Sequence, residues 1–186
     1  MPDTPRKTII LCEGQHDCLF IKSLLDGYPL KYATKEEIRD APRDGEFRII
    51  KKFYRDSRLK YLIKDEDGKN RCIDTFCELY DMDNGWNMVV ILDSDGGSTL
   101  RLFRKTTHET LRKDILLQHN EYLHTTKDLM KHKVFFIPDS LEDEVRSSIQ
   151  KNLDIGNKSE QQRKIRQFIH DGTDWIGHLR SLLTSS

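Results

Sequence analysis

The sequence lacks three features that would point to a class of protein at once: a long hydrophobic run, an excess of charge of one sign, and closely paired cysteines. No apolar stretch approaches the roughly 18 residues of a membrane-spanning helix, and no cleavable leader is seen, so we expect a cytoplasmic protein that has no membrane partner. The 31 basic and 31 acidic residues cancel, so any binding to nucleic acid needs a local basic patch. The four cysteines form no C-x-x-C pair and are predicted to be small core residues.

What is present is a polar chain with the length of one domain. The 186 residues are 36% hydrophobic and 33% charged, with a mean hydropathy of −0.69. Domains most often contain about 100–200 residues, so the chain has room for one hydrophobic core. The seven histidines show no zinc-ligand spacing and are predicted to lie mostly on the surface.

Short apolar runs alternate with helical spacings along the chain. Strands are predicted at 8–12, 47–50, 88–92 and 134–137. Helices are predicted between them, including one around Ile73 and one that carries Leu111, Ile115 and Leu116. The alternation predicts an α/β fold, with a mainly parallel central sheet of about four strands flanked by helices. Residues 151–186 are predicted to form a helical C-terminal extension on the same domain, with a capping box of Ser159 and Gln162.

Acidic residues gather where three of the predicted strands end. They are Glu13 and Asp17 after the first strand, Asp93 and Asp95 after strand 88–92, and Glu142 and Glu144 after the last. The carboxyl ends of parallel strands meet at one edge of a sheet, so we expect these carboxylates to share one small volume. Like charges so close together repel unless some bind protons or a cation is present. Carboxylates suit Mg²⁺ or Mn²⁺, and two such ions about 3.5–4 Å apart can support phosphodiester cleavage.

Each of these acidic residues also has a purely structural interpretation. Asp93 and Asp95 suit a strand-to-helix corner, and Asp17 suits the first turn of a helix. Asp139 and Glu142 have the spacing of a capping box. The coincidence of so many carboxylates at one predicted sheet edge favours the metal site.

Two of the acidic motifs resemble those of a known domain. Glu13-Gly14-Gln15-His16-Asp17 and Asp93-Ser94-Asp95-Gly96, each directly after a strand, resemble the two motifs of the Toprim domain. Leu141-Glu142-Asp143-Glu144 resembles the Glu-x-Glu element of Toprim nucleases of the OLD (overcoming lysogenization defect) family. Residues 28–86 add nothing to this likeness, which otherwise spans about residues 7–150.

The resemblance implies a Rossmann-like Toprim domain over residues 1–150 and a metal-dependent nuclease activity. It implies that Glu13, Asp93 and Asp95 are catalytic. The implied ligands of Mg²⁺ or Mn²⁺, with room for two ions, are Glu13, Asp17, Asp93, Asp95, Glu142 and Glu144.

The implied substrate is nucleic acid, either DNA or RNA. Lys51 and Lys52, in a stretch that mixes basic and aromatic residues, and Arg101 and Arg104, after the Asp-x-Asp turn, are candidates for phosphate contact. Each could equally belong to an exposed charged face. No G-x-x-x-x-G-K-[ST] motif occurs, so the ABC-type ATPase that accompanies OLD nuclease domains would have to act in trans. The sequence leaves open a monomer or a homodimer.

Two other functions remain open. The run from Asp93 to Thr99 also resembles the first motif of haloacid dehalogenase-type phosphatases, in which Asp93 would be the nucleophile and Asp95 the acid and base. That motif normally opens its fold, whereas a strand and a helix precede it here. The other alternative is a Toprim-like binding subunit without catalysis, which the balanced charge favours. An EF-hand is excluded, because neither Asp-rich turn has Gly at loop position 6 with Glu at position 12.

Overall fold

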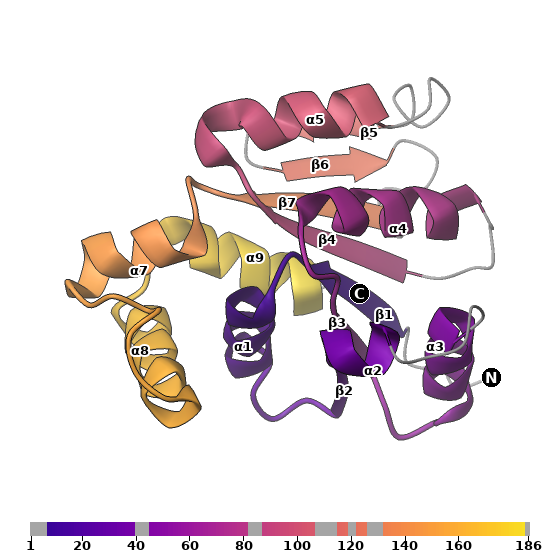
Figure 1. Cartoon of the computed structure of the whole chain (residues 1–186), viewed down its shortest axis with the longest axis horizontal. Helices are drawn as coiled ribbons and strands as arrows, with labels where there is room; N and C mark the ends of the chain where they lie inside the picture. The colour runs from indigo at the N-terminus through magenta and orange to yellow at the C-terminus, as the bar shows by residue number, and fades with distance from the viewer. Residues whose placement is uncertain are drawn as a thin grey trace.

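The fold is built on a seven-stranded sheet with helices on both faces (Figure 1). A computed structural model describes residues 7–39, 45–81, 87–106, 115–118, 122–125 and 132–184. The strands are β1 (Thr8–Cys12), β2 (Leu30–Ala33), β3 (Tyr61–Asp65), β4 (Asn87–Asp93), β5 (Ile115–Gln118), β6 (Tyr122–Thr125) and β7 (His132–Ile137). The described helices are α1 (Gln15–Leu24), α2 (Lys35–Arg39), α3 (Gly45–Arg55), α4 (Lys69–Asp81), the 3₁₀ turn η1 (Asp95–Gly97), α5 (Ser98–Thr106), α7 (Leu141–Ile149), α8 (Lys158–Asp171) and α9 (Asp174–Thr184).

The strand order is β2-β3-β1-β4-β7-β6-β5, and its first five strands are parallel. Strands β6 and β5 extend the sheet as an antiparallel hairpin beyond β7. The predicted α/β fold with a mainly parallel sheet and C-terminal helices is therefore confirmed. The parallel order makes β1, β4 and β7 direct neighbours, so their carboxyl ends lie side by side.

Alternate residues of the central strands supply two separate cores, because successive side chains of a strand point to opposite faces. Ile9 and Leu11 face a layer made by α2, α3, α4 and α5. Ile10 and Cys12 face the layer made by α1, α7, α8 and α9. Cys12, Cys18 and Cys72 are buried as predicted, and Cys77 is half-buried.

Aromatic side chains hold the C-terminal helices against the sheet. The Trp175 ring of α9 lies 5.6 Å from that of Phe20 in α1 and 6.0 Å from that of Phe135 in β7, measured between centroids. Phe168 of α8 is fully buried and lies 5.9 Å from Trp175. These ring contacts tie α8 and α9 to the layer that also contains α1.

Two local predictions were wrong. The predicted strand 47–50 belongs to helix α3, because Ile49, Ile50 and Phe53 share one buried helical face. The predicted helix through Ile115 and Leu116 is replaced at those positions by strand β5, while Leu111 lies outside the described residues.

Strands β2 and β3 were not predicted from the sequence. Strand β3 is buried along its whole length although it includes Lys64 and Asp65. The ammonium group of Lys64 lies 2.8 Å from the Glu66 carboxylate, and both side chains are fully buried. Because the strand contains charged residues, it lacks the apolar run that predicts a buried strand. Such charges can be buried only beside partners that the fold supplies.

The predicted capping box of α8 was also wrong. The cap is Asn157, whose side-chain oxygen accepts a hydrogen bond of 3.1 Å from the backbone N–H of Glu160. The Glu160 carboxylate in turn accepts one of 3.2 Å from the backbone N–H of Asn157. The helix therefore begins before Ser159. No helix among the residues described is long and apolar enough to cross a membrane.

Replacing Phe168 by alanine should destabilise the protein by about 3–5 kcal/mol, because the change leaves a cavity between α1, α8 and α9. Chemical denaturation measures the free energy of unfolding. Ile155→Ala is the control, since Ile155 is 65% exposed and its truncation should cost less than about 0.5 kcal/mol. Equal effects of the two substitutions would contradict the packing of α8.

Candidate functional site

Three acidic side chains come together where the neighbouring strands β1, β4 and β7 end. Glu13 directly follows β1, Asp93 is the last residue of β4, and Glu142 lies in the first turn of α7, after β7. The parallel register pairs Cys12 with Ile91 and Asp93 with Ile137, which aligns the ends of the strands. The structure thus places these carboxylates at one edge of the sheet, where the charges of Glu13 and Glu142 act on Asp93.

Backbone hydrogen bonds hold the two central carboxylates. The backbone N–H of Asp93 donates to Oε1 of Glu13 over 2.8 Å. The backbone N–H of Leu141 donates to Oδ1 of Asp93 over 3.1 Å. Glu13 is therefore bound to the end of β4, and Asp93 to the start of α7, so the three strand ends are joined through these two side chains.

Asp17 lies beside this pair but uses its carboxylate to cap α1. Its Oδ2 accepts a hydrogen bond of 3.0 Å from the backbone N–H of Gly14. The side chain is buried, and this burial, together with the charges of Asp93 and Glu13, raises the pKa of Asp17 well above its ordinary range. Asp17 thus combines the predicted structural role with a place in the acidic cluster.

The electrostatic potential of the cluster favours the binding of protons or cations. Burial, and then the negative charges of Glu13 and Glu142, raise the pKa of Asp93 to about 7. Burial also raises the pKa of Glu13, against the opposing effects of the Asp93 backbone N–H and the Lys69 ammonium group. A carboxylate with a raised pKa is ionised at neutral pH only at a cost in free energy, which a bound cation would offset.

Asp95 lies on the outer side of the cluster, next to a basic residue that the sequence analysis missed. The ammonium group of Lys69, the first residue of α4, contacts the Asp95 carboxylate and donates a hydrogen bond of 2.9 Å to Thr99 Oγ1. Lys69 could be suspected from sequence only as a basic residue that directly follows a turn. The turn that carries Asp95 is left-handed, with φ of 44° at Asp95 and 60° at Gly96, a conformation that glycine adopts readily.

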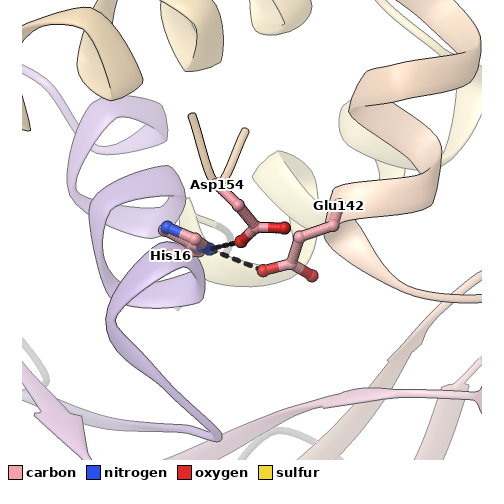
Figure 2. Close-up of side chains that lie close together, drawn as sticks. All are labelled: His16, Glu142 and Asp154. Carbon is pink, nitrogen blue, oxygen red and sulfur yellow. Dashed lines mark hydrogen bonds and ion pairs between the residues drawn. The ribbon is translucent and has the colours of Figure 1, made fainter. Parts of the chain in front are cut away.

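Glu142 also belongs to a second group of ligand-type side chains, with His16 and Asp154 (Figure 2). Nδ1 of His16 is 2.6 Å from Glu142 Oε1 and 3.7 Å from Asp154 Oδ1. The hydrogen bond to Glu142 raises the pKa of His16 and lowers that of Glu142. His16 is an exception to the prediction that the histidines lie mostly on the surface, because its side chain is 20% exposed. Asp154 was not predicted, because no motif includes it.

The structure directs Glu144 away from this group. Its Oε2 accepts a hydrogen bond of 3.0 Å from the indole N–H of Trp175 in α9. Glu144 is thus joined to the C-terminal helices, whereas Glu142, two residues earlier, faces His16.

The predicted basic contacts are spread over different parts of the molecule. Lys52 lies in the last turn of α3, where the carbonyl oxygens of Phe53 and Asp56 bind Lys7 just before β1. This is the amino end of β1, opposite the carboxylates, and Lys51 is exposed on the same helix. Arg101 is exposed near the start of α5, close in sequence to Asp95, while the side chain of Arg104 lies outside the described atoms.

Comparison with known proteins adds no functional assignment. No protein-family model matches the chain, and no curated protein matches it. Among solved structures, a de novo designed protein with a P-loop NTPase fold, determined by solution NMR, is similar at 11% identity and a TM-score of 0.33, over 93% of this chain and 94% of the design. A likeness this weak carries no argument about function.

Asp93→Asn should make the metal-free protein more stable above pH 7. The folded state raises the pKa of Asp93 from 3.8 to about 7, so it binds more protons than the unfolded chain in this window, and stability falls as the pH rises through it. Asparagine removes this cost and can still accept the hydrogen bond from Leu141. The expected gain in the free energy of unfolding is up to about 4 kcal/mol at pH 8, and it should disappear below pH 3.8.

Chemical denaturation in the presence of a chelator, repeated from pH 4 to pH 8, measures this dependence. Asp26→Asn is the control, because Asp26 is exposed just after α1. A variant at position 93 that is no more stable than the wild type at pH 8 would show that the cluster carries no electrostatic cost.

Proposed function

We propose that the protein is a Toprim-type phosphodiesterase that uses Mg²⁺ or Mn²⁺ to cleave nucleic acid. The observation that carries this proposal is the placement of Glu13 and Asp93 at the ends of the adjacent parallel strands β1 and β4, where the charge of Glu142 also acts on Asp93. The buried Asp17 adds a fourth carboxylate, and burial together with the charges of the neighbouring carboxylates raises the pKa values of Asp17 and Asp93. Ligand sites in open parallel sheets lie at this edge, beyond the carboxyl ends of the strands.

The donor set fits a hard divalent cation. All the donors are carboxylate oxygens, which Mg²⁺ and Mn²⁺ prefer. Glu13 and Asp93 would hold the ion, and a backbone N–H already orients one oxygen of each carboxylate. Asp95 would join them, and Glu142 and Asp17 would contribute charge from the inner side of the cluster.

The chain's own residues supply the remaining parts of a phosphodiesterase site. When bound, the ion would activate a water molecule and stabilise negative charge on the scissile phosphate. Glu13 would act as ligand or general base, and burial raises its pKa, which favours proton uptake. Lys69, beside Asp95 and Thr99, would bind a phosphate oxygen, and Arg101 would extend this basic contact.

A partner would complete the activity in the cell. The ABC-type ATPase that the OLD resemblance implies would be supplied in trans. With no net charge to attract nucleic acid, the chain would depend on local groups such as Lys69 and on this partner for substrate affinity.

Glu13→Gln and Asp93→Asn should each lower metal-dependent cleavage by at least about 100-fold, because each removes a metal-binding carboxylate. The activity is measured as cleavage of supercoiled plasmid, single-stranded DNA and structured RNA, first with Mn²⁺ and then with Mg²⁺. Glu144→Gln is the matched control, since its carboxylate binds Trp175, and it should keep cleavage within about threefold of the wild type.

Two results would replace this proposal by another function. Hydrolysis of phosphate monoesters without cleavage of nucleic acid, lost in Asp93→Asn, would indicate the phosphatase with Asp93 as nucleophile. Metal binding without hydrolysis of either substrate, even with an ATPase partner present, would indicate a binding subunit.

Lys69→Gln should lower kcat/KM for the nucleic acid by at least about tenfold, because it removes a charged donor to the phosphate. Steady-state kinetics on the substrate identified above measure this effect. Arg71→Gln is the control: Arg71 is an exposed cation two residues further along α4, and its loss should change kcat/KM by less than about twofold. Equal losses of kcat/KM in both variants would show that any positive charge on α4 has this effect, and that Lys69 has no specific contact with the phosphate.

A further inference from the structure

His16, Glu142 and Asp154 form the one group of at least three histidine, cysteine or carboxylate side chains whose ligand atoms converge closely within the described residues. One ligand atom from each lies within 4.8 Å of the other two. Figure 2 shows the imidazole of His16 and the two carboxylates turned toward a common point from three separate segments. The three residues lie 126 and 12 positions apart in sequence, so the fold alone assembles them.

Each side chain is held by a well-packed segment. His16 lies in the first turn of α1, whose inner face is buried against the sheet, and Glu142 lies in the first turn of α7 next to the fully buried Leu141. Asp154 follows the fully buried Leu153 in the connection from α7 to α8. The buried Lys164 donates a hydrogen bond of 2.6 Å to the Asn152 carbonyl and also binds the Ile155 carbonyl, so it fixes this connection on both sides of Asp154.

We propose that His16, Glu142 and Asp154 bind a divalent transition-metal ion, Zn²⁺ or Mn²⁺, in preference to Mg²⁺. One imidazole nitrogen and two carboxylate oxygens suit first-row transition metals, whereas Mg²⁺ takes oxygen ligands almost exclusively. Three protein ligands leave a coordination position for water, as in catalytic zinc sites. The Asp154 side chain is 64% exposed, which gives the ion a path from solvent.

This site differs in its ligands from the carboxylate pair of Glu13 and Asp93. Glu142 lies between the two groups: it binds His16 on one side, and its charge raises the pKa of Asp93 on the other. An ion at His16 would therefore neutralise the edge of the acidic cluster. The inference does not rest on nuclease activity, because metal binding is measured directly and neither Glu13 nor Asp93 is a ligand here.

Titration calorimetry on the full chain tests the proposal. Zn²⁺ and Mn²⁺ are each titrated alone and in the presence of excess Mg²⁺. His16→Gln and Asp154→Asn should each weaken Zn²⁺ binding by at least about tenfold, since each removes a ligand. His170→Gln and Asp171→Asn are matched controls: this exposed pair lies 3.3 Å apart on α8, outside the site, and its substitution should leave the affinity unchanged. In the wild type, Zn²⁺ should also shift the NMR signals of the His16 ring.

The outcomes separate the proposal from its alternatives. Loss of affinity in both site variants but not in the controls supports it, and retained binding in Asp93→Asn separates it from the proposed nuclease centre. Unchanged Zn²⁺ affinity in His16→Gln, or displacement of Zn²⁺ by equimolar Mg²⁺, would overturn it. Loss in His16→Gln with none in Asp154→Asn would overturn the three-ligand assignment. Asp154 is exposed, so its variant tests the site without risk to the fold.

Discussion

Repulsion among carboxylates at the ends of β1, β4 and β7 is the constraint on which the rest of this site depends. Parallel pairing of these strands forces Glu13 and Asp93 together, and backbone N–H groups of Asp93 and Leu141 hold them there. Burial makes the repulsion stronger, because less water is available to screen the charges. The fold therefore keeps an arrangement that costs free energy at neutral pH. Such an arrangement is typical of functional sites.

Two basic side chains contact the carboxylates at this edge of the sheet. Lys69 contacts Asp95 on the α4 side, and His16 contacts Glu142 on the α1 side. Both partners come from segments that follow a strand at the same edge of the sheet. The acidic centre thus lies between an ammonium group suited to phosphate and an imidazole suited to a metal ion. In the proposed nuclease, Lys69 would contact the substrate, and the ion proposed at His16 would be separate from the one held by Glu13 and Asp93.

The difference between predicted and observed elements has a physical cause in each case. Strand β4 is apolar along nearly its whole length, and this pattern identifies it without knowledge of its neighbours. Strand β3 contains Lys64, which can be buried only because Glu66 lies beside it, so its sequence pattern resembles a polar loop. Helix α3 begins with residues of mixed preference, and its assignment depends on the apolar face that Ile49, Ile50 and Phe53 present to the sheet. Short apolar runs are therefore ambiguous until their packing partners are known.

The sequence by itself determined the α/β class and the acidic residues Glu13, Asp17 and Asp93, because apolar strands and the carboxylates that directly follow them are local patterns. Only the tertiary structure decided which carboxylates work together. It directed Glu144 to Trp175 and Glu142 to His16, although both glutamates lie in one helical turn. It also brought Lys69 to Asp95 and Asp154 to His16, pairs that no spacing along the chain connects. Strand order and helix packing set such contacts, and these depend on the whole chain rather than on any one segment of it.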